Sequence, residues 1–198
     1  LIVWVDDDPT APVPLMRAAS GISLRNHAGV APAGRSHAIA RPLAPCDTLD
    51  PAARFVAAVE AARRRLSIHP ERIFIVGRGP SLAQLLAEIP LDGDASPAGV
   101  AWVADSITSC DPGRLGWNRR LDLPLLLAVP EPTLDERADL RSRLLALHAA
   151  GCDATTITSS RRPNFLTNAL ANVNRWVMSF ITGEPAFPQA PIERIDVN

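Results

Sequence analysis

The residues best placed to do chemistry lie in a single stretch, from Ile73 to Leu82, which contains Gly77, Gly79 and Ser81. The apolar residues before Gly77 predict a buried strand that ends in a tight turn, and a helix follows. A turn of this kind holds a serine nucleophile above a parallel sheet when its sequence is G-x-S-x-G. Here the middle position is Gly79, which has no side chain to attack a carbonyl group.

Composition narrows the class of protein. The 198 residues fit one domain with one sizeable core, and 47% of them are hydrophobic, which is ordinary for a globular protein. A formal net charge of −1 gives no strong field toward nucleic acid or an anionic membrane. Every basic residue is arginine, and neither lysine nor tyrosine occurs, which indicates a bacterial genome rich in G and C. No apolar run approaches the roughly 20 residues of a membrane-spanning helix.

Cysteine usage predicts neither a disulfide framework nor a metal site. The three cysteines, Cys46, Cys110 and Cys152, are far apart and odd in number, and no metal-ligand spacing occurs. We therefore expect reduced thiols, no cofactor and no metal. This pattern slightly favours the cytoplasm but does not fix the compartment.

Apolar runs alternate with helical patterns along the chain, which predicts an α/β fold with a mostly parallel, doubly wound sheet flanked by helices. The expected strands are Leu1–Val5, Gly29–Pro32, Ile73–Val76, Val100–Ala104, Leu123–Val129 and an outer strand, Ala154–Thr158. Ligands of such sheets bind at the carboxyl ends of the strands. Because the chain begins inside an apolar run, we expect that further residues, including the first strands of the fold, precede it. The predicted domain covers residues 1–183, and residues 184–198 form a proline-rich extended tail.

Local signals mark the helices. A helix starts at Asp50-Pro51, with apolar positions on one face and three arginines in the last turn. A second runs from about Ser81 to Ile89, a third opens with a capping box from Thr133 to Glu136, and a fourth is capped by Asn164 and ends before Gly183. The apolar residues expected on one face are Phe55, Val56, Val59, Ala62 and Leu66 in the first helix, and Leu166, Leu170, Val173, Trp176, Val177 and Phe180 in the fourth. The third helix carries Leu140, Leu144, Leu145 and His148, the last of which we expect to be satisfied or exposed.

Three phrases carry a resemblance to a known family. They are Ser67–Gly77, which leads into the glycine turn, Leu123–Val129, and Leu144–Gly151, followed by a strand and a closing helix that contains Asn174-Arg175-Trp176. Together they resemble the α/β-hydrolase fold, and within it the small serine esterases of the phospholipase/carboxylesterase group. The resemblance extends from Leu1 to about Ile181. It implies a serine nucleophile at the elbow, an acid, a histidine and an oxyanion loop.

The residues at these four positions do not supply that chemistry. The nucleophile position falls on Gly79, where glycine relaxes a backbone that the elbow would strain. Ser81 is a displaced nucleophile or, as we favour, part of the first turn of the following helix. The acid position falls near Pro132, which leaves Glu131 as a substitute or an exposed loop acid.

The remaining two parts are also missing. The span expected to hold the histidine, from Ser159 to Phe165, contains none, and the four histidines are His27, His37, His69 and His148. The oxyanion loop is replaced by Asp6-Asp7-Asp8, whose carboxylates would repel a developing oxyanion. These three acids are commoner as turn and cap residues than as metal ligands.

The expected function is therefore an α/β-hydrolase-like protein that is inactive as an esterase and serves as a binding or interaction module for a small molecule or a protein. The expected binding residues are Asp6, Asp7, Gly77, Arg78, Gly79 and Ser81. One alternative is a residual carboxylic-ester hydrolase that uses Ser81 with His27 or His37. Another is an anion or phosphate binder at the Gly77–Gly79 turn, where a helix begins. The ligand and the oligomeric state stay open.

Overall fold

The computed structural model describes residues 1–5, 22, 28–30, 51–89, 93–106, 123–149, 151–160 and 164–187. Strands and helices alternate along them, in the order β1 (Ile2–Val5), β2 (Gly29–Val30), α2 (Pro51–Arg63), β3 (Phe74–Gly77), α3 (Pro80–Glu88), β4 (Gly99–Val103), β5 (Leu125–Pro130), α4 (Leu134–Ala149), β6 (Ala154–Ser159) and α5 (Phe165–Thr182). The six strands form one sheet in the order β2-β1-β3-β4-β5-β6, and every neighbouring pair is parallel. The expected α/β class, with a parallel sheet between helices, is confirmed.

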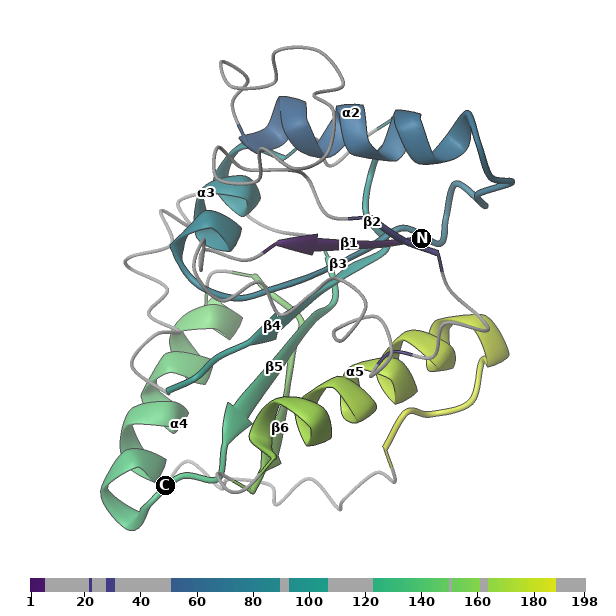
Figure 1. Ribbon diagram of the computed structural model, residues 1–198. Helices are drawn as coiled ribbons and strands as arrows, with labels where there is room; N and C mark the ends of the chain where they lie inside the picture. The colour runs from purple at the N-terminus through teal and green to yellow at the C-terminus, as the bar shows by residue number, and fades with distance from the viewer. Residues whose placement is uncertain are drawn as a thin grey trace.

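Helices cover both faces of the sheet (Figure 1). On one face, Val3, Ile75 and Trp102 pack in a core cluster with side chains of α2, α3 and α4. On the other face, Trp4 and Val76 pack with side chains of α5. Since both faces are buried, the central strands are continuous apolar runs rather than alternating ones.

The sheet reverses its winding direction beside β1. Ile22, which lies in the sequence between β1 and β2, is 2% exposed and packs in the cluster on the α5 face. By contrast, α3 follows β3 directly and packs on the opposite face through Leu82 and Leu86. The chain therefore leaves the adjacent strands β1 and β3 toward opposite faces, and α/β sheets bind ligands at such a switch point, outside the carboxyl ends of the strands.

The predicted face of α2 is correct over its first three turns and wrong at its end. Phe55 and Val59 are fully buried, and Val56 and Ala62 pack against the core. Leu66, expected on the same face, is 49% exposed. The helix ends at Arg63, so the helical period no longer directs the next residues toward the core.

The capping box of α4 is confirmed. The backbone N–H of Thr133 donates to Glu136 Oε2 at 2.8 Å, and the N–H of Glu136 donates to Thr133 Oγ1 at 3.4 Å. Of the residues noted on this helix from the sequence, Leu140 is buried and Leu144 is half-buried, while Leu145 and His148 are exposed. Leu147 is buried as well. Leu147 lies seven residues after Leu140, which is two helical turns, so it lies on the same face.

Both predicted ends of α5 are confirmed in position, but the N-terminal cap lacks the side-chain hydrogen bond expected of it. Asn164 occupies the N-cap, yet its side chain makes no capping hydrogen bond. Gly183 ends the helix in the left-handed conformation, with φ 73°. Phe180 is 41% exposed rather than buried, although its ring makes edge contacts with Phe74 and Trp176.

The start of the predicted tail packs against the domain. Ala186 and Phe187 contact the core cluster on the α5 face. Residues 188–198 of that tail lie outside the described residues. No helix in the described part of the chain is both long and apolar enough to cross a lipid bilayer.

Candidate functional site

The candidate site is the turn at the carboxyl end of β3, next to β1. Gly77 is the last residue of β3 and pairs in register with Val5. The backbone N–H of Arg78 donates to the carbonyl oxygen of Val5 at 3.0 Å. A Cβ atom on Gly77 would lie 2.5 Å from that same oxygen. Glycine is therefore required at this position because the two strands approach each other closely.

Gly79 makes the change of direction from strand to helix. It is the N-cap of α3, with φ 76° and ψ −174° and no side-chain capping bond. This combination belongs to a region of backbone space that is essentially restricted to glycine. The unusual backbone expected at Gly79 is thus present, and only two residues separate β3 from α3.

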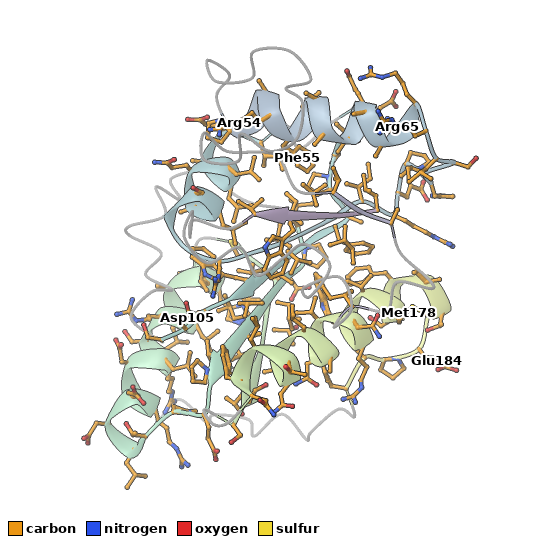
Figure 2. All side chains as sticks on the ribbon, viewed as in Figure 1. Arg54, Phe55, Arg65, Asp105, Met178 and Glu184 are labelled. Atoms are coloured by element: carbon orange, nitrogen blue, oxygen red, sulfur yellow. The ribbon has the colours of Figure 1, made fainter. Side chains whose placement is uncertain are left out.

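Arg78 faces an acid from the neighbouring strand. Its Nη1 lies 3.8 Å from Oδ2 of Asp105, which follows β4 by two residues. The Arg78 side chain is 17% exposed and that of Asp105 is 70% exposed, so solvent weakens the pair. Asp105 lies on the left of Figure 2, on the side where the strand arrows end, whereas Arg65 lies at the far end of α2.

Sequence analysis had not selected Asp105. The available signal was its place directly after the predicted strand Val100–Ala104, at the edge where ligands bind.

Ser81 lies in the first turn of α3, as favoured from the sequence, and is half-buried. It sits two residues beyond Gly79 and therefore does not occupy the turn itself.

The segments to which the resemblance assigns the acid and the histidine meet at the same edge, where β5 and β6 end. The backbone N–H of Glu131 donates to the carbonyl oxygen of Ser159 at 2.8 Å, while the residue is exposed. Ser159 is 6% exposed, and its Oγ accepts a hydrogen bond from Asn172 Nδ2 of α5 at 3.3 Å. Asn172 Oδ1 in turn accepts a bond from Arg175 at 3.3 Å. The polar group that ends β6 is thus tied to α5, and sequence analysis had not predicted this network.

The two described histidines lie at the opposite edge of the sheet. His69 precedes β3, and its Nδ1 accepts a bond from the backbone N–H of Glu71 at 3.3 Å. His148 lies in the last turn of α4, which starts after the carboxyl end of β5 and runs back for 16 residues, about 24 Å. Neither imidazole can serve as a base for a group at Gly79 or Ser81.

The other predicted residues fall outside the described part of the chain. These are Asp6 and Asp7, with their neighbour Asp8, and the two histidines of the early loops, His27 and His37. Among the residues that the structure describes, no three His, Cys, Asp or Glu side chains gather into a group that could hold a metal ion.

Comparisons of the chain with protein-family models, with curated proteins and with solved structures find no match. The case for a function therefore rests on the geometry of the carboxyl edge.

Proposed function

We propose that this chain is an α/β-hydrolase-like protein that does not hydrolyse esters and acts as a binding or interaction module at the carboxyl edge of its sheet. The observation that carries the proposal is Gly79. It occupies the turn between β3 and α3 where a serine esterase holds its nucleophile, and its backbone takes a glycine-only conformation.

The surroundings of Gly79 support the absence of esterase chemistry. A serine nucleophile needs a base within about 2.6–3.2 Å, and both described histidines lie at the other edge. Where the resemblance places the acid and the histidine, the chain has an exposed Glu131 and the bonded Ser159. These parts of the site are used for structure instead of proton transfer.

The test treats the purified protein with a fluorophosphonate probe and with short-chain aryl esters, alongside the matched variant Ser81→Ala. We expect no covalent label and no turnover above that of buffer in either protein. Labelling of the wild type that Ser81→Ala abolishes would overturn the proposal and establish the residual hydrolase.

Binding is tested separately by protein-detected NMR with non-hydrolysable aryl ketones and aryl carboxylates as probes. We expect the backbone amides of Gly77, Gly79 and Asp105 to shift with added probe, while amides at the amino edge stay fixed. Shifts confined to the amino edge, or none with any probe, would show that this edge is not the binding surface.

The structure gives less support to an anion site at the same turn. Arg78 faces Asp105, and Pro80 supplies no N–H at the start of α3. We expect inorganic phosphate to leave the melting temperature unchanged, and a concentration-dependent rise would favour the anion site instead.

A further inference from the structure

The outer strand β6 presents a row of backbone groups that have no partner strand in the described part of the chain. Its inner side is paired with β5, from Leu125 opposite Ala154 to Pro130 opposite Ser159. The N–H of Leu125 donates to the carbonyl of Asp153 at 2.9 Å, and the N–H of Glu131 donates to that of Ser159 at 2.8 Å.

Those two bonds fix which residues of β6 face outward. In a parallel ladder, alternate residues of a strand bond to the same neighbour. Since Asp153 and Ser159 bond toward β5, the odd-numbered residues between them do so as well. The N–H and C=O groups of Ala154, Thr156 and Thr158 therefore point away from the sheet.

Within the described part of the chain, β6 carries none of the charges, prolines or bulges that keep outer strands apart. Proteins block such edges with lysines, prolines, inward-pointing charges or bulges. The sequence of β6 is Ala-Thr-Thr-Ile-Thr-Ser, with no charge and no proline, and it pairs with β5 along six consecutive residues without a bulge. Thr155 and Thr158 are exposed, one toward each face of the sheet.

We propose that β6 pairs antiparallel with β6 of a second copy of this chain, so that the two sheets continue into one across a twofold axis. When Thr156 lies opposite Thr156 of the second copy, each outward N–H group of one β6 lies opposite an outward C=O group of the other. Ala154 then faces Thr158 of the second copy, and all three outward residues exchange hydrogen bonds. No charged residue of β6 meets another across the axis, because the strand has none.

The residue at the axis supports a second copy over an unrelated strand. Thr156 Oγ1 is buried and has no hydrogen-bond partner among the described residues. Threonines directly opposite each other on neighbouring antiparallel strands form side-chain hydrogen bonds. A change of χ1 rotamer brings the hydroxyl of Thr156 to that of its equivalent, which gives both a partner.

The test measures the mass of the full chain by sedimentation velocity and light scattering across a range of concentrations. We expect the wild type to reach twice its 21.2-kDa mass. Thr156→Pro should remain monomeric under the same conditions, because it removes an outward N–H that β5 does not use. The matched variant Thr156→Val keeps the backbone donor and should remain dimeric with a raised dissociation constant. A wild type that is monomeric throughout, or a Thr156→Pro variant that still dimerises, would overturn the proposal.

Amide hydrogen exchange gives a second measurement that needs no variant. In the dimer, the amides of Ala154, Thr156 and Thr158 should be as protected as those of Thr155 and Ile157. On dilution to monomer, the even-numbered amides should lose protection and the odd-numbered ones keep it. Protection of the even-numbered amides in a monomer would mean that the chain itself, or an added extended peptide, covers the edge, and would also overturn the proposal.

Discussion

Replacing Gly79 with serine tests whether a hydroxyl group at the turn between β3 and α3 is enough to restore ester hydrolysis. If the base and the acid are missing as well, the added serine stays inactive. At φ 76° and ψ −174°, a residue with a Cβ atom pays strain of about 1–3 kcal/mol. Serine also lowers the conformational entropy of the unfolded chain, which offsets about 0.4–1 kcal/mol of that loss in unfolding free energy. We therefore expect Gly79→Ser to lose about 1–2 kcal/mol, and its melting temperature to fall by about 2–8 °C for a chain of this size.

The assay combines urea unfolding, followed by circular dichroism, with fluorophosphonate labelling and aryl ester hydrolysis. The matched control is Gly183→Ser, at φ 73° and ψ 3°, where a Cβ atom meets nothing within 4 Å. That left-handed position should cost about 0.5–1 kcal/mol net. Neither variant should hydrolyse esters, because the added hydroxyl has no imidazole beside it. Turnover or labelling by Gly79→Ser would refute our account of the site, and equal stability of Gly79→Ser and wild type would refute the backbone argument.

Three further substitutions test how the sheet is held together. Gly77→Ala places a methyl group 2.5 Å from the backbone oxygen of Val5, so we expect a loss of about 3 kcal/mol in urea unfolding, and a loss below about 1 kcal/mol would contradict the close approach. Gly99→Ala places its methyl group 2.7 Å from Trp176 Cη2, and Trp176→Phe in the same chain should make the alanine less costly than it is alone, as a double-mutant cycle would show. Thr133→Ala removes the cap of α4 and should lower the unfolding free energy by about 1 kcal/mol, whereas Thr133→Ser should lower it by much less.

The sequence was sufficient for the fold class because the strands are buried on both faces. Runs such as Leu125–Val129 have no alternation, are too short for a helix and end at a proline, which favours strands of a sheet covered on both sides. An error lies where a helix ends. The helical period places Leu66 on the buried face of α2, but the helix ends at Arg63 and Leu66 is 49% exposed.

The site was less predictable, because it depends on which strands are neighbours. The glycine turn was visible from local spacing, and so was the helix that follows it. The pair of Arg78 with Asp105 requires that β3 lie beside β4, and the bond of Ser159 with Asn172 requires that α5 pack under β6. Contacts between segments that are distant in the sequence cannot be predicted from the residues near either partner.

The place of β1 in the sheet has a consequence for how the chain is made. Ile2 pairs with both Gly29 and Phe74, so β1 lies between two strands that are translated after it. At about 5–20 residues per second, a ribosome needs roughly 4–14 s to synthesise the segment that separates Ile2 from Phe74. During that interval the apolar side chains of Ile2–Val5 have no β3 to pair with, so this edge of β1 is exposed to aggregation for longer than an edge that pairs with the next described strand in the sequence.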